Sequence, residues 1–89
     1  MLRITVVSQT GEEAVLKVEG WVSEENVELL KQEGTRCLRK VGCLVLDLAN
    51  VKYIDDAGIA LLQRWPGERL KLRGGSPFMR MLLRTHGLV

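Results

Sequence analysis

Residues 44–62 decide how the chain folds, and they read Leu44-Val45-Leu46-Asp47-Leu48-Ala49-Asn50-Val51-Lys52-Tyr53-Ile54-Asp55-Asp56-Ala57-Gly58-Ile59-Ala60-Leu61-Leu62. The apolar run Cys43–Leu48 is too short for an independent helix, so it fits a central strand covered on both faces of a sheet. After an expected turn at Ala49-Asn50 the chain reaches two adjacent acids, and residues 57–65 then form a short helix that Pro66 ends. The stretch predicts a strand, a loop and a helix in close succession.

Two further strands are expected before this stretch. Leu2, Ile4 and Val6 alternate with polar residues, which is the period of a half-buried strand. Turn-forming residues at 9–12 separate them from a second alternating run, Ala14–Val18, so the two runs predict an antiparallel hairpin. Gly20 is expected to break the second strand.

A first helix is expected from Ser23, whose hydroxyl can cap the free N–H groups of a helix start, to Val41. Residues 69–73 alternate as a last strand, and Ser76-Pro77 opens a final helix that runs to about Thr85. The element order is therefore β-β-α-β-α-β-α, in one α/β domain over residues 1–89. Right-handed crossovers would place the helices on a mixed sheet whose last two strands are parallel neighbours.

Composition narrows the class of protein. The chain has 89 residues, of which 46% are hydrophobic and 27% charged, as in an ordinary globular domain. No apolar run approaches the ~20 residues that a membrane span needs, and the first residues do not resemble a signal peptide, so a cytoplasmic protein is expected. Cys37, Cys43 and His86 match no zinc-binding spacing, and buried reduced thiols are the expected state of both cysteines.

The residues needed for catalysis are scarce. The only histidine, His86, lies among the last four residues of the sequence, and no phosphate-binding glycine loop is present. We therefore expect no enzyme, no cofactor and no metal.

Charge is spread unevenly along the chain. The whole chain carries +2, whereas residues 64–89 contain six Lys or Arg against Glu68 alone, a net charge of +5. Such a basic C-terminal segment is typical of a surface for nucleic acid, acidic lipid or an acidic partner, and equally of a solvated face. Phe78 is its only aromatic residue after Trp65, so the segment lacks the aromatic side chains on which bases stack.

Asp55 and Asp56 are the only acidic pair in a special position. They precede a helix, where the helix dipole and free N–H groups favour carboxylates. One interpretation is an N-cap followed by a first-turn acid. The other, an acid–base pair, would need a pocket that drives the two pKa values apart.

The stretch 44–62 resembles the signature of the STAS domain family. That signature is an apolar strand ending in Asp-Leu, a connection ending in an apolar residue followed by Asp, then a Ser or Thr, a small residue, Gly and an apolar helix. Gly20-Trp21-Val22 and Gly75-Ser76-Pro77 resemble the family's flanking turns. The family comprises bacterial anti-sigma factor antagonists, subunits of some ABC lipid transporters and the tails of sulfate transporters. The resemblance implies a non-catalytic regulatory module whose partner is a protein, either a kinase-like anti-sigma factor or a transporter ATPase.

The resemblance also identifies what is unusual here. Switchable members carry a phosphorylatable Ser or Thr where this chain has Asp56, and Ala57 follows, so no hydroxyl remains in the loop. We therefore expect a chain resembling an anti-sigma factor antagonist that is not phosphorylated at this position. The alternatives are an accessory subunit of an ABC lipid transporter, or an anion-binding or nucleic-acid-binding protein that uses the basic C-terminal segment.

The expected partner surface is the loop Tyr53–Gly58 with the exposed face of helix 57–65. Ile59 and Leu62 lie three residues apart, so one of them can face the partner, or both can belong to the core. Trp65 is either an interface anchor or packs against the end of the helix.

Overall fold

The computed structural model describes residues 1–89 as four strands and three α-helices: β1 (Leu2–Gln9), β2 (Glu13–Val22), α1 (Val27–Leu38), β3 (Cys43–Ile54), α2 (Asp56–Arg64), β4 (Leu70–Arg73) and α3 (Pro77–Thr85). A 3₁₀ turn, Gly67–Arg69, lies between α2 and β4. The strands form one sheet in the order β1-β2-β3-β4, antiparallel between β1 and β2 and parallel elsewhere. The expected α/β order and the parallel pairing of the last two strands are confirmed.

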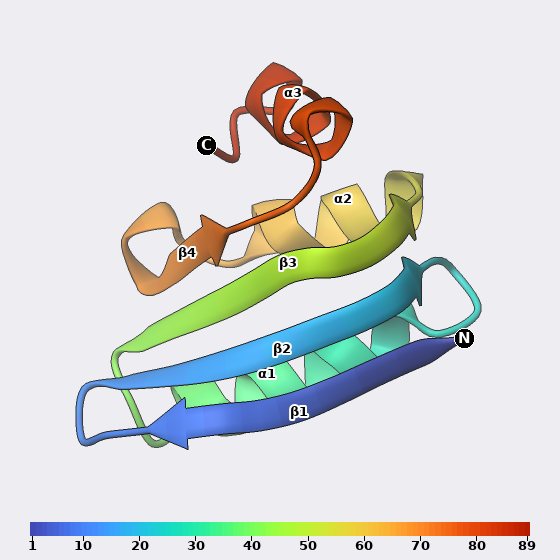
Figure 1. Ribbon diagram of the computed structural model, residues 1–89. Helices are drawn as coiled ribbons and strands as arrows, with labels where there is room; N and C mark the ends of the chain where they lie inside the picture. The colour runs from blue at the N-terminus through green and yellow to red at the C-terminus, as the bar shows by residue number, and fades with distance from the viewer.

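The helices cover one face of the sheet. α1 and α2 lie behind it in Figure 1, and α3 lies beyond the β3–β4 edge at the top of the view. The core between the sheet and the helices includes Leu16 of β2, Leu44 and Leu46 of β3 and Leu83 of α3, none of which is exposed. Cys37 belongs to this core as a free thiol, and burial raises its pKa.

β3 differs from the expected strand, which was to be covered on both faces. Figure 1 shows no helix in front of the sheet, so layered covering exists on one side only. Val45 is nevertheless buried, because side chains on neighbouring strands surround it; Val15 of β2 and Lys71 of β4 are its register partners. Burial by cross-strand neighbours and burial by a helix both favour an apolar residue, and the run of apolar residues could not distinguish them.

Both central strands are longer than expected. β2 continues through Gly20, whose positive φ of 98° and close approach to the Met1 carbonyl require glycine, so this residue bends the strand and does not end it. The prediction of a turn at Ala49-Asn50 is wrong, because both residues belong to β3. β3 runs on to Ile54, and the pairing between β2 and β3 changes register there, while Asp47 Oδ1 accepts the Ala49 N–H at 3.0 Å.

The start of α1 also differs from the expectation. The helix begins at Val27, with Asn26 at the N-cap position and no side-chain capping bond, so Ser23 is not its cap. Residues 23–26 instead form a turn in which Asn26 Oδ1 accepts the Ser23 N–H at 2.9 Å. The expected arrangement had the Ser23 side chain accepting from backbone N–H groups, whereas here the Asn26 side chain accepts from the backbone of Ser23. Both residue types form such local hydrogen bonds, so the sequence alone did not distinguish the two arrangements.

Candidate functional site

Asp55 fixes the start of α2. Its Oδ1 accepts the Gly58 N–H at 3.0 Å, and its Oδ2 accepts the Glu24 N–H at 2.9 Å. One carboxylate therefore caps α2 and holds the loop after β2 against the loop after β3. The hydrogen bond from Gly58, with a smaller contribution from Glu24, holds the pKa of Asp55 below its usual value.

Asp56 is the first residue of α2 and is exposed. No hydrogen bond or ion pair engages its carboxylate, in contrast to that of Asp55. The local interpretation of the pair as an N-cap followed by a first-turn acid is therefore confirmed. The two acids therefore have different roles. The Asp55 carboxylate is hydrogen-bonded to backbone N–H groups of the fold, whereas the Asp56 carboxylate is a free negative charge at the positive end of the helix dipole.

Gly58 brings α2 close to the sheet. A Cβ at this position would lie 2.6 Å from Ile54 Cγ1 and 2.8 Å from Val22 Cγ1, which are nearer than real Cβ contacts. Any other residue would push the start of α2 away from the ends of β2 and β3. The position of Asp56 relative to the sheet thus depends on this glycine.

The other residues of the predicted partner surface differ in how far they are exposed to solvent. Tyr53 is 53% exposed, and Ala57 lies in a hollow between α1 and α2. Ile59 and Leu62 are buried, 4% and 1% exposed, so the alternative in which both belong to the core is confirmed and neither faces a partner. They face the sheet because α2 lies flat on it, with Gly58 and Leu61 buried on the same side.

Trp65 is also not a free anchor. Its ring fills the space beside Gly34 of α1, where a Cβ would lie 2.6 Å from two ring atoms, and it packs against the core. The alternative interpretation, packing at the end of the helix, is the correct one. Gly34 makes room for the ring from a position 31 residues earlier in the chain.

Trp21 is an exposed residue that sequence reasoning did not assign to the site. It is 56% exposed and pairs with Tyr53 across β2 and β3, and these two rings with Lys52 line a hollow of about 400 Å³. The signal was present in the sequence, because Trp21 is an odd-numbered neighbour of the apolar residues Val18 and Val22. Side chains alternate along a strand, and Val18 and Val22 are buried, so Trp21 lies on the opposite side of β2.

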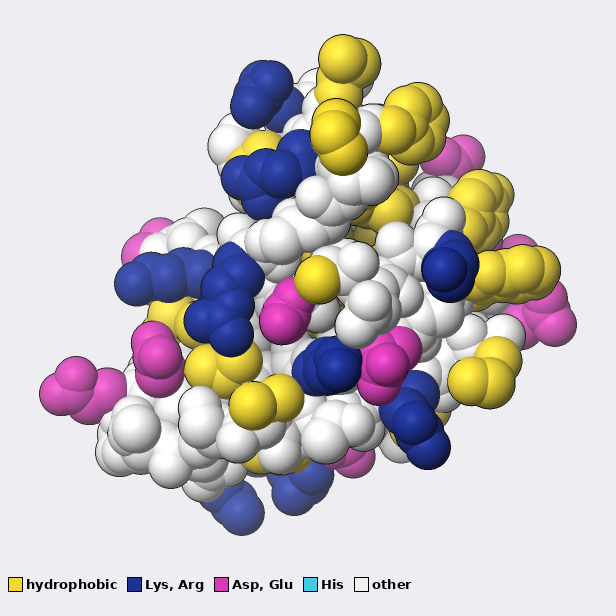
Figure 2. Space-filling view, in the orientation of Figure 1, with side chains coloured by type: hydrophobic (Ala, Val, Ile, Leu, Met, Phe, Trp, Pro, Cys, Tyr) yellow, Lys and Arg dark blue, Asp and Glu magenta, His cyan; other side chains and the backbone are white.

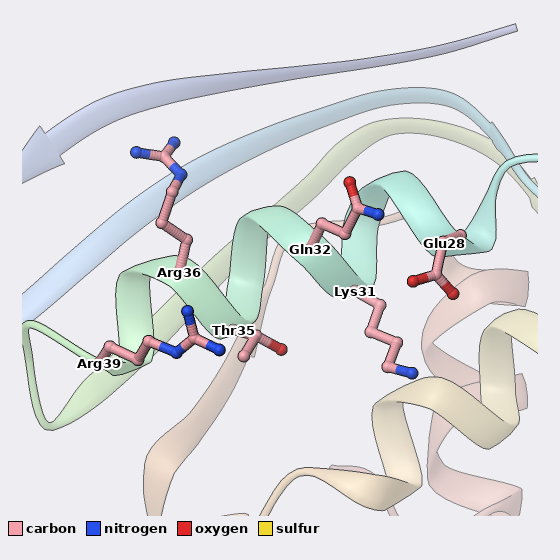
Figure 3. Close-up of a pocket in the computed structure, with 6 residues that line it drawn as sticks. All are labelled: Glu28, Lys31, Gln32, Thr35, Arg36 and Arg39. Carbon is pink, nitrogen blue, oxygen red and sulfur yellow. The ribbon is translucent and has the colours of Figure 1, made fainter.

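Two hollows involve α1. The one between α1 and α2, about 230 Å³, is lined by Val27, Glu28, Lys31, Ala57, Ala60, Leu61 and Arg64. The other, about 310 Å³, lies on the polar side of α1 and has no apolar lining residue. Figure 3 shows that its side chains spread outward from one helix and do not converge on a common point. No group of three or more His, Cys, Asp or Glu side chains is placed to hold a metal ion.

The mixed four-stranded sheet, with helices on one face and a charged helix start after its third strand, defines a class of small α/β domains. The family model described as "Mlab, STAS domain" matches residues 5–89. The chain therefore belongs to the STAS domain family.

Several solved structures share this fold. An anti-sigma factor antagonist from Mycobacterium paratuberculosis superposes with a TM-score of 0.79 at 21% identity, covering 99% of this chain and 80% of that one. The antagonist SpoIIAA in its unphosphorylated form gives 0.74 at 19% identity, covering 92% of this chain and 82% of that one. The Bacillus cell fate determinant SpoIIAA in its phosphorylated form gives 0.73 at 18% identity, covering 97% and 85%.

No curated protein shows a significant sequence match to the chain. No helix is both long and apolar enough to cross a membrane.

An acid titration tests the role of Asp55. Because its pKa is lowered in the folded state, its contribution to stability is complete above the unfolded value of about 3.9 and is lost as pH falls through the lower, folded value. Asp55→Ala should lose about 1 kcal/mol at pH 7, as other N-cap substitutions do. The difference in melting temperature between the two proteins should stay constant down to about pH 5 and narrow below about pH 4.

Glu25→Ala is the matched control, since this neighbouring exposed acid makes no side-chain hydrogen bond. Its melting temperature should follow that of the unmodified chain at every pH. An Asp55→Ala difference that persists unchanged at pH 2 would show that the carboxylate charge does not stabilise the helix start.

Proposed function

We propose that the chain is a non-catalytic regulatory module that binds a protein partner through its docking end, which we define as Trp21, Tyr53, Asp56 and Ala57. The observation that carries the proposal is the free carboxylate of Asp56 at the first turn of α2, three residues after the exposed Tyr53, which pairs with the exposed Trp21. Aromatic residues are enriched at protein interfaces, and an exposed charge at the rim of an interface controls the choice of partner. We expect the module to work in the cytoplasm.

The proposal includes a loss of switching. One of the similar structures is a phosphorylated form of SpoIIAA, whereas this chain has no hydroxyl between Tyr53 and Gln63. Phosphorylation adds about −1.5 to −2 of charge and three acceptor oxygens, and Asp56 supplies −1 and two oxygens. Asp56 would therefore partly imitate a phosphorylated residue. The docking end would carry this negative charge permanently and could not be switched by phosphorylation at this position.

Two partners fit the proposal: a kinase-like anti-sigma factor, as for antagonists, and a transporter ATPase, as for STAS subunits of ABC lipid transporters. The hollow between α1 and α2 adjoins Ala57 and extends the docking end toward Arg64, so a partner could insert a side chain there. Recovery of an ATPase with membrane subunits would select the second partner, and recovery of a kinase-like protein with a sigma factor would select the first.

Substitution of Asp56 tests whether its charge controls binding. Asp56→Asn and Asp56→Ser should each change affinity for the native partner at least three-fold, measured by calorimetry, because both remove the negative charge and Asn also keeps the size and shape of Asp. The fold should lose no more than about 1 kcal/mol, the usual worth of an acid in the first turn of a helix. Tighter binding by Asn would show that Asp56 imitates a phosphate; weaker binding would show that the partner recognises the carboxylate.

Glu68→Gln is the control, because Glu68 is an exposed acid in the 3₁₀ turn after α2, at the other end of that helix from Asp56, and lines none of the hollows. It should leave affinity within two-fold. If Asp56→Asn and the unmodified chain bind alike, the charge has no regulatory role and the proposed imitation is wrong.

A further inference from the structure

We propose that α3 carries a second binding surface, separate from the docking end, whose ligand is an anionic lipid bilayer. The surface comprises Phe78 and Met81 with the basic residues Arg73, Arg80 and Arg84. It contains no residue of α2 and none of the docking end.

The apolar part of this surface is unusual for a helix that packs on a core. Met79 and Leu83 are 3% and 0% exposed and hold α3 against the domain. Phe78 and Met81, three residues apart, are 74% and 62% exposed, more than any other large apolar residue except Met1. α3 therefore has a buried apolar face and also presents a large aromatic ring and a thioether to solvent, where they gain nothing from the fold.

The charged side chains of α3 itself have one sign, and Asp47, the register partner of Arg73, is an acid at the turn before the helix. α3 contains Arg80 and Arg84 and no acid, and Arg73 at the end of β4 is exposed. Arg80 donates a hydrogen bond to the Gly74 carbonyl at 3.1 Å, which places its guanidinium at the turn between β4 and α3. Figure 2 shows dark-blue and yellow side chains next to one another on the lobe that α3 forms. Basic side chains beside exposed apolar ones are the composition of helices that bind the surface of anionic membranes.

The shape of the surface favours a bilayer over a peptide or a nucleic acid. α3 projects beyond the edge of the sheet in Figure 1, and none of the three hollows on the molecule is lined by a residue of α3. A convex helix with apolar tips suits a deformable lipid surface, whereas a peptide needs a groove. The surface holds a single aromatic ring, which is too few for the stacking of successive bases. Like charges also disfavour pairing of α3 with a second copy of itself.

Flotation with vesicles tests the proposal on the intact chain. Vesicles of phosphatidylcholine and phosphatidylglycerol in a 3:1 ratio should bind at least ten-fold more strongly than phosphatidylcholine alone, and binding should weaken as salt rises. Phe78→Ser with Met81→Ser should lower the partition coefficient at least ten-fold. Arg84→Gln should lower it about five-fold, the usual worth of one basic residue near such a surface.

The control is Val7→Ser with Leu29→Ser, which removes two other exposed apolar side chains, 56% and 46% exposed, on different elements. It should change partitioning less than two-fold, and circular dichroism should show that every variant is folded. Equal binding to neutral and anionic vesicles, no binding to either, or an equal loss in the control would overturn the proposal. So would tighter binding to single-stranded DNA that Phe78→Ser leaves unchanged. Asp56→Asn should not affect vesicle binding, so a failure of the proposed function leaves this result standing.

Discussion

Gly58→Val is expected to destabilise the domain by about 3 kcal/mol, the upper part of the range for overpacked cores. The new Cβ would meet Ile54 at 2.6 Å and Val22 at 2.8 Å, and both are buried residues at the ends of strands. Neither strand end can retreat easily, because the Asp55 N–H donates to the Val22 carbonyl at 3.0 Å and ties the two together. In a domain of this size such a loss lowers the melting temperature by roughly 12–20 °C.

Gly67→Val is the matched control, since a Cβ at Gly67 would meet no atom within 4 Å and its φ is not positive. Its melting temperature should fall by no more than a few degrees. A second variant, Gly58→Ala with Ile54→Val, should recover part of the stability that Gly58→Ala alone loses, because it removes a methyl group from the crowded side. Equal melting temperatures for Gly58→Val and Gly67→Val would show that α2 does not depend on close approach to the sheet.

Arg69→Met is expected to cost about 2–4 kcal/mol, because Arg69 satisfies the end of α1. Its guanidinium donates to the carbonyl of Leu38 at 2.6 Å and to those of Val41 and Gly42 at 3.1 Å. Hydrogen bonds from charged groups are worth about 1.5–3 kcal/mol each, and a cation at this end also complements the helix dipole. Met keeps much of the volume of the side chain and removes every donor.

Arg69→Lys should recover less than half of the loss, because a single ammonium group cannot reproduce a planar fork that reaches three carbonyls. The control is Arg39→Met, since Arg39 is the exposed residue directly after α1 and makes no side-chain hydrogen bond. Urea unfolding at pH 7 measures all three variants. If Arg69→Met is no less stable than Arg39→Met, the end of α1 does not depend on Arg69.

Local features of the fold could be predicted where one short segment decides the outcome. Ser76 accepts the Met79 N–H at 3.1 Å and Pro77 follows it, as the pattern at the start of the last helix indicates. The hairpin turn was also predictable, and Thr10 Oγ1 accepts the N–H groups of Glu12 and Glu13 at 3.1 Å. The predicted start of α1 was wrong. Ser23 and Asn26 can both stabilise a turn or a helix start, and the sequence does not show which of them does so here.

Features that depend on distant residues could not be predicted. α2 is short and has apolar residues at 59, 61 and 62, so periodicity alone does not show which side meets the sheet. The burial of Trp65 beside Gly34 and the bonds of Arg69 to the end of α1 join residues about 30 positions apart. At the candidate site, the sequence located the acids at the start of α2 correctly. The division of roles between Asp55 and Asp56 required the position of Glu24, which belongs to another loop.

The central claim is that a protein partner binds the docking end, and hydrogen exchange on the native complex tests it most directly. The intact chain is used to isolate its partner from native cells, and amide exchange is compared between the free chain and the complex. Exchange should slow at residues 21–24 and 53–61, which contain the docking end, and stay unchanged at residues 8–14, the hairpin turn at the far end of β1 and β2. Protection confined to β1 or α3, with none at the start of α2, would contradict the account.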